Sequence, residues 1–163
     1  MNRMMILVAV AAFALVAGAC SIDVERNEDG SLELETVLTE DSLKNEISKG
    51  IDDPQVNYLT IDMKIGHALV AMERVRDSGI GVDEISFRVD LRVADGHLAA
   101  DVTEAVWNEF PIPQDLVDIW NEELAAGLEK EGKKDPDSTL LSVELTENAL
   151  TMQWHVETDQ SKG

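Results

Sequence analysis

Residues 84–105 have the sequence EISFRVDLRVADGHLAADVTEA, and this stretch decides the fold. Apolar and polar residues alternate along its first half, which is the period of a strand with one buried face. Asp95-Gly96 follows, a dipeptide that favours a two-residue type I′ turn. Pairing through this turn places three apolar pairs on one face: Val93 with Leu98, Leu91 with Ala100, and Val89 with Val102.

The same register places Glu104 opposite Phe87, on the apolar face. A β-bulge near Thr103 would turn this carboxylate outward, and a position at the open end of the core would leave it in water. A functional buried carboxylate is the third alternative, although the sequence offers it no partner. We therefore expect a bulge or an edge position at Glu104.

Working outward, similar patterns predict the remaining elements. Residues 32–38 alternate as a strand, and Thr39 is expected to cap a helix that ends at Gly50. Two more hairpins are expected, and Ser78 to Gly81 is expected to form a flexible loop. The hairpins pair residues 59–65 with 68–75 and residues 141–145 with 150–156, the latter matching Leu145 with Leu150, Val143 with Met152, and Leu141 with Trp154.

The strongest helix is predicted from Gln114 to about Lys130, after the strand-breaking residues 110–113. Its apolar face is expected to contain Leu116, Ile119, Trp120, Leu124 and Leu128. Its polar face is expected to contain Asp118, Asn121, Glu122 and Glu129. The element order predicts an α+β fold, in which an antiparallel sheet of about six to seven strands has two helices packed on one face.

The N-terminal residues indicate export. Residues 1–19 combine one basic residue, an apolar run and a small-residue cleavage zone, as in a signal peptide. Ala17-Gly18-Ala19-Cys20 resembles the bacterial lipobox, which implies that Cys20 is acylated and becomes the mature N-terminus. A retained transmembrane anchor and an ordinary signal peptide are the alternatives.

The expected organisation then follows from Cys20. Residues 20–30 form a lipid-anchored acidic tether, residues 31–158 a single domain, and residues 159–163 a polar tail. The expected location is the outer face of the cytoplasmic membrane or the outer membrane, with the acyl chains as the membrane contact.

The charge of the chain excludes nucleic acid as a partner. Removal of residues 1–19 takes away Arg3 alone among the charged residues, which leaves 12 basic and 33 acidic residues and a net charge near −21. Such a surface repels phosphate backbones and anionic headgroups. The acidic residues are spread along the chain, which favours solubility or a saline habitat over an acidic binding tail.

The sequence contains no pattern of an enzyme active site. It has no phosphate-binding loop, nucleophile elbow or HExxH motif, and we expect no enzyme activity, cofactor or metal. His67, His97 and His155 are widely separated and are expected at the surface. Asp90 and Asp101 are expected to face each other across the hairpin as part of a solvated charge ladder with Arg88 and Arg92.

The candidate binding feature is an apolar space between the helices and the sheet. Its predicted lining consists of Leu43, Ile47, Phe87, Trp120, Leu124, Met152 and Trp154. Methionine and tryptophan in such a position are compatible with a groove that adapts to acyl chains. The alternative is that these residues touch one another and form a dry core, which is the more common arrangement of apolar side chains.

Three short segments resemble a known kind of protein. Residues 38–43 (LTEDSL), 95–98 (DGHL) and 120–125 (WNEELA) look like those of small bacterial lipoproteins similar in layout to the YceB-type members of the tubular lipid-binding (TULIP-like) superfamily. The resemblance implies binding of lipid or another apolar ligand at the cell envelope. The alternative expectation is a membrane-tethered module with a dry core that binds an envelope protein.

Overall fold

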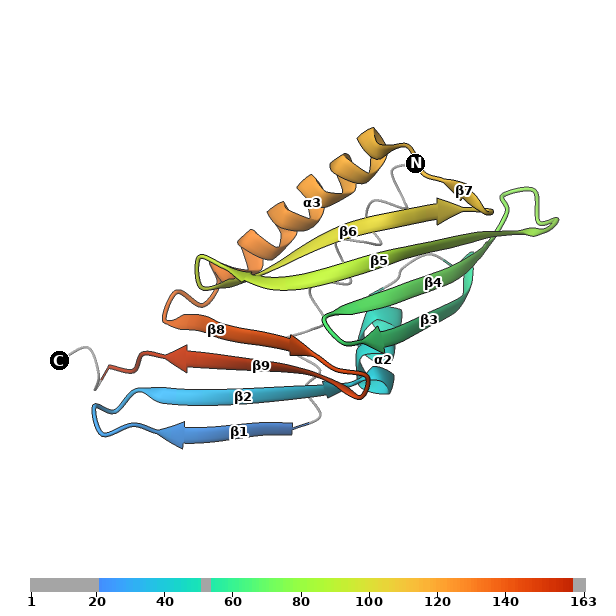
Figure 1. The fold of residues 1–163 in the computed structure, drawn as a ribbon. Coiled ribbons are helices and arrows are strands. Elements are labelled where there is room, and N and C mark those ends of the chain that lie inside the picture. Colours follow the sequence, from blue (N-terminus) through green and yellow to red (C-terminus); the bar gives the residue numbers. More distant parts are fainter. Residues whose placement is uncertain (1–20, 51–53, 160–163) are drawn as a thin grey trace.

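The computed structural model of the chain describes residues 21–50 and 54–159. This part of the chain forms two antiparallel sheets and two helices (Figure 1). The four-stranded sheet has the order β1-β2-β9-β8, with β1 (Ser21–Arg26), β2 (Leu32–Thr39), β9 (Ala149–Val156) and β8 (Ser138–Leu145). The five-stranded sheet has the order β3-β4-β5-β6-β7, with β3 (Val56–Lys64), β4 (His67–Val75), β5 (Val82–Ala94), β6 (His97–Trp107) and β7 (Phe110–Pro111). The helices are α2 (Glu40–Gly50) and α3 (Gln114–Gly132).

The predicted α+β class and the antiparallel pairing are confirmed, but the single sheet is replaced by two. Helix α3 packs on β6, while α2 connects the two sheets and contacts β2 and β3 (Figure 1). The two helices therefore cover different regions instead of one shared face. Apolar side chains of both sheets and both helices nevertheless join in one hydrophobic core.

The hairpin of β5 and β6 has the predicted register. Val93 lies opposite Leu98, and the two further apolar pairs are also as predicted. Asp95 and Gly96 have φ angles of 51° and 74°, the left-handed backbone that a type I′ turn requires.

The register of this hairpin then shifts between Ser86 and Arg88. Glu104 has a φ of 51° and is exposed, so the bulge that was one of the alternatives is confirmed.

The hairpin of β8 and β9 follows the prediction over its first half only. Leu145 pairs with Leu150, and Val143 with Met152, but the third expected pair is wrong. A register shift between Leu140 and Ser142 brings Leu140 opposite Trp154. As a result Leu140 is 1% exposed and Leu141, which was expected inside, is 53% exposed.

The starts and faces of the helices agree with the sequence patterns in part. The Ser42 N–H donates to Thr39 Oγ1 at 3.3 Å, which is the expected N-cap of α2. Helix α3 begins at Gln114, as predicted, and buries Trp120 together with Leu124 and Leu128. The fourth buried position is Val117, whereas Ile119 is exposed.

Side chains of the helices cover two sheet edges. The Val102 N–H of β6 donates to Asn121 Oδ1 at 2.6 Å, and Asn121 Nδ2 donates to the Val102 carbonyl at 3.0 Å. Asn121 was expected on the polar face of its helix. Instead, its side-chain amide makes the hydrogen bonds that a neighbouring strand would otherwise make to the backbone of Val102, a residue that is fully buried. At the opposite edge, the Met63 N–H of β3 donates to Glu40 Oε2 at 3.0 Å.

The edge strand β8 meets the turns of the other sheet. The Leu140 N–H donates to the Gly96 carbonyl at 2.7 Å, and the Gly66 N–H donates to the Leu145 carbonyl at 3.1 Å. These bonds connect the turns of the five-stranded sheet to the edge of the four-stranded sheet. A residue with a side chain would fit poorly at position 96, because its Cβ would lie 2.9 Å from Thr139 Cγ2.

Strand β1 is the other edge of the four-stranded sheet. Residues 21–26 fall within the segment expected to be an acidic tether, yet they pair along their whole length with β2. The two apolar residues of the segment, Ile22 and Val24, were too few to give a recognisable alternating pattern. The predicted signal peptide and Cys20 lie outside the described residues.

Candidate functional site

The predicted groove residues are mostly core residues. Those with buried side chains are Leu43, Phe87, Trp120, Leu124 and Met152. Trp154 is partly buried against the same core, and the side chain of Ile47 lies outside the described part of the chain. The structure therefore brings six of the seven into one cluster, where they pack against other protein side chains.

Two contacts show how the aromatic members of this cluster are held. The rings of Phe87 and Trp120 meet edge to face, with centroids 6.5 Å apart, so that α3 is fixed on β5. Trp154 Nε1 donates to Thr36 Oγ1 at 3.3 Å, within the four-stranded sheet. Thr36 Oγ1 in turn donates to the Met152 carbonyl at 3.4 Å. Specific partners of this kind favour a packed core over an adaptable groove.

The predicted charge ladder lies on the outward face of β5 and β6. Asp90 lies opposite Asp101, as expected. Arg88 makes two hydrogen bonds to Asp90, of 2.6 and 2.8 Å, which lower the pKa of this carboxyl. Arg92 Nε lies 3.0 Å from Asp101 Oδ2. Because each aspartate has its own arginine, the arrangement is that of a neutralised surface ladder.

The described residues also bear on metal binding and on membrane-spanning helices. They contain no cluster of three metal-ligating side chains placed to hold an ion. None of their helices has the length and apolar character needed to span a bilayer.

A different feature, which the sequence analysis did not single out, lies at the end of the five-stranded sheet where the loop between β4 and β5 is close to β7 (Figure 1). We call it the apolar tip and define it by three exposed side chains: Ile80, Trp107 and Phe110. Ile80 is 80% exposed and lies in the loop between β4 and β5, and Phe110 is 75% exposed and lies in β7. Exposure of large apolar side chains to water is unfavourable in free energy, and a partner that covers them removes this cost.

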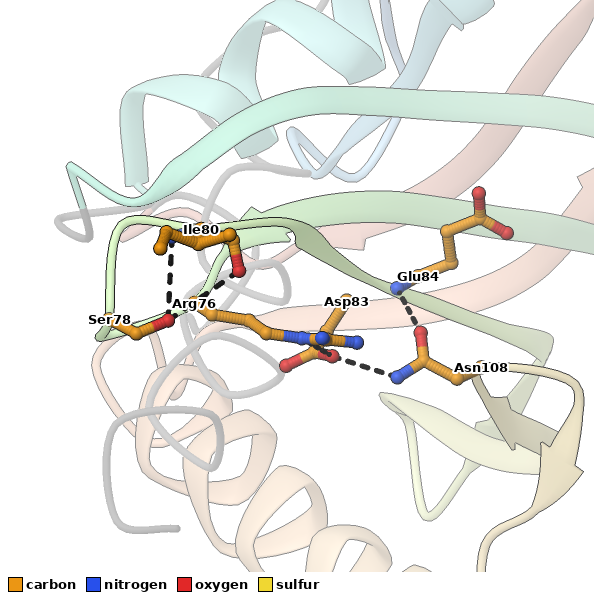
Figure 2. Close-up of polar contacts among 6 residues, drawn as sticks. All are labelled: Arg76, Ser78, Ile80, Asp83, Glu84 and Asn108. Carbon is orange, nitrogen blue, oxygen red and sulfur yellow. Dashed lines mark hydrogen bonds and ion pairs between the residues drawn. The ribbon is translucent and has the colours of Figure 1, made fainter.

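Asp83 joins the two loops that carry the apolar tip. Its Oδ1 atom accepts hydrogen bonds from Asn108 Nδ2 and from Arg76 Nε, both at 2.8 Å (Figure 2). The side chain of Trp107 makes a smaller contribution to lowering the pKa of the same carboxylate. The Asp83 side chain is only 15% exposed, and these donors, Asn108 first, lower its pKa.

The backbone of both loops is fixed by further contacts. Asn108 Oδ1 accepts from the Glu84 N–H, and the Asn108 N–H donates to the Glu84 carbonyl, each at 2.8 Å. Ser78 and Ile80 exchange hydrogen bonds in the opposite loop (Figure 2). Asn108 and Glu109 both have positive φ angles, of 47° and 69°, a conformation that costs free energy at residues other than glycine. Loops held in this way present their apolar side chains in a defined arrangement.

Sequence reasoning missed this site because its parts are separated along the chain. The loop 78–81 was expected to be flexible, and Asp83 and Asn108 carry no motif that connects them across 25 residues. The available clue was an isoleucine between two glycines in a loop, since exposed loop tips are usually polar.

We expect replacement of Asp83 with alanine to destabilise the fold by roughly 1 to 3 kcal/mol at neutral pH, because Arg76 and Asn108 lose their acceptor. The folded-state pKa of Asp83 is lowered, so its contribution is complete above the ordinary aspartate pKa and is lost as the pH falls below about 4. Thermal unfolding of both proteins between pH 7 and pH 3 measures this difference. The exposed Asp77→Ala variant of the same loop is the control, and equal effects of the two substitutions would contradict the role of Asp83.

No protein-family model matches the chain, and no curated protein matches it in sequence. Two features of the chain bear on its function: the lipobox-like sequence ending at Cys20 and the apolar tip, whose loops are joined by Asp83.

Proposed function

We propose that this chain is an exported envelope lipoprotein, acylated at Cys20, which binds a protein partner through the apolar tip and has no catalytic role. The single observation that carries the proposal is that two loops, distant in sequence, are fixed by Asp83 while both present large apolar side chains to water. Fixed aromatic and aliphatic residues lose little conformational entropy on binding, which favours their use as anchors in an interface.

The charges around the apolar tip define the partner. Asp77, Glu84 and Glu109 are exposed on the strands and loops of the tip, while the guanidinium of Arg76 is engaged by Asp83. The mature chain as a whole has a net charge near −21, from 33 acidic residues and the 12 basic residues that remain after Arg3 is removed. A complementary surface therefore has an apolar depression surrounded by lysine or arginine side chains.

The packing of the core supports a protein partner over a lipid bound between helices and sheets. An acyl chain in that space would have to displace contacts such as the edge-to-face pair of Phe87 and Trp120. Close-packed interiors resist such displacement. Lipid binding in this space, as the lipoprotein resemblance implies, is the competing proposal that the experiments below also address.

Photo-cross-linking in intact cells tests the proposed interface. A Phe110→p-benzoylphenylalanine variant should give one discrete protein adduct, and its yield should fall when Ile80→Ser is added. Leu141→p-benzoylphenylalanine is the matched control, because Leu141 is an exposed apolar residue on β8. The same adduct from both positions, or adducts with phospholipid alone at position 110, would contradict a protein interface at the apolar tip.

A further inference from the structure

The strand β1 begins immediately after the residue that we propose to be acylated. Ser21 follows Cys20 in the sequence and is already paired with Val37 of β2. A residue of extended chain spans at most about 3.6 Å, so no flexible linker separates the acyl chains from the folded sheet. This inference rests on the proposed acylation of Cys20.

The two faces of β1 differ sharply in chemistry. Ile22 and Val24 share one face and are 58% and 60% exposed. Asp23 and Glu25 lie on the other face, opposite Glu35 and Glu33 of β2. The strand is therefore amphipathic: one face is apolar and uncovered, and the other carries two carboxylates that lie beside two carboxylates of β2.

The apolar face of β1 continues into the sheet. Ile22 lies opposite Thr36, and Val24 lies opposite Leu34, which in turn pairs with Trp154. Leu34 and Trp154 are partly buried, so exposure of this face increases from the core toward the edge strand. An aromatic residue whose N–H is hydrogen-bonded within the protein, as in Trp154, can meet an apolar surface without leaving a polar group unpaired.

We propose that the lipid bilayer covers this face, so that β1 lies on the membrane with Ile22 and Val24 at the level of the lipid headgroups. Acyl chains on Cys20 enter the bilayer, and the Cα atoms of Ile22 and Val24 lie within about 7 and about 14 Å of the attachment point. The headgroup layer is only about 5 to 8 Å thick, so these side chains are held at its depth or just above it. Asp23 and Glu25 then point away from the lipid.

This arrangement gives the lipoprotein a fixed orientation. A domain on a flexible tether samples all orientations above the membrane, whereas a domain whose first strand rests on the lipid does not.

A fluorescence experiment on the full-length, acylated protein tests the orientation. The protein is produced with its signal peptide, purified from membranes, and reconstituted in phosphatidylcholine vesicles that contain nitroxide-labelled lipid. An environment-sensitive fluorophore is attached at Val24→Cys or, as the matched control on the opposite face, at Asp23→Cys; acylation blocks the native thiol of Cys20. We expect a blue-shifted emission at position 24 and quenching several-fold stronger than at position 23. An Ile22→Cys label should behave like the label at 24, which controls for local damage by either substitution.

The other outcomes overturn the inference in distinguishable ways. Equal quenching at positions 23 and 24 would mean that the domain has no fixed orientation. Protection of position 24 from a water-soluble quencher without quenching by lipid would mean that a strand of another chain covers β1. Mass spectrometry of the mature N-terminus is made on the same sample, and the lack of an acylated Cys20 would overturn the lipoprotein proposal together with this inference.

Discussion

Replacement of Cys20 with serine should move the protein from the membrane fraction to the soluble fraction, or leave it as an uncleaved precursor. The mature chain, with 33 acidic and 12 basic residues once Arg3 is removed, is repelled by anionic headgroups. The proposal assigns membrane attachment to the acyl chains on Cys20. Ultracentrifugation of cell lysates, followed by mass analysis of the N-terminus, measures both location and processing.

The Ser21→Ala variant is the control for this experiment, because it changes the neighbouring residue and leaves the thiol in place. It should remain fully membrane-bound and acylated. A correctly cleaved Cys20→Ser protein that remains in the membrane fraction would contradict lipid anchoring. The contacts of Ile22 and Val24 alone are too few to retain the protein, since even a single myristoyl chain gives only reversible binding.

The hairpins were predictable because their information is local. Asp95-Gly96 specifies both the turn and the register, and a period of two residues then assigns each side chain to a face. Even the unusual position of Glu104 followed from this reasoning, since a carboxylate on an apolar face requires a bulge or an edge.

The arrangement of the hairpins relative to one another was not predictable in this way. The alternating pattern of β8 does not reveal the irregularity that turns Leu140 inward and Leu141 outward. The two sheets are connected by hydrogen bonds between β8 and the turns at Gly66 and Gly96, which join residues far apart in the sequence. Asn121 is a further example, because a polar residue on a helix gives no sign that a strand backbone is its partner.

The candidate groove shows that sequence periodicity also has a limit in predicting function. Sequence periodicity correctly identified apolar residues that come together, including Leu43 and Met152 from opposite ends of the chain. Whether such residues enclose a ligand or only one another depends on packing at a scale that periodicity does not encode. The apolar tip, in contrast, could not be assembled without the contacts of Asp83.

Replacement of Trp120 with alanine is expected to destabilise the protein by about 3 to 5 kcal/mol. The side chain is buried and meets Phe87 edge to face, so the substitution removes apolar contact and leaves a cavity beneath α3. Ile119→Ala is the matched control on the adjacent, exposed position of the same helix and should cost about 1 kcal/mol or less. Urea-induced unfolding of the purified proteins gives both values.

Addition of fatty acid distinguishes a dry core from a natural groove as the environment of Trp120. If the core is dry, tryptophan fluorescence of the wild-type protein stays unchanged on addition of fatty acid. Fatty acid can restore stability to Trp120→Ala only by entering the engineered cavity, and it then leaves wild-type stability unaffected. If the seven residues instead line a natural groove, the wild-type protein responds as well, because a ligand that binds the folded state alone stabilises it increasingly as the ligand concentration rises above its Kd. A wild-type response would therefore favour lipid binding between the helices and sheets, whereas a response of the variant alone supports a packed core and a protein partner.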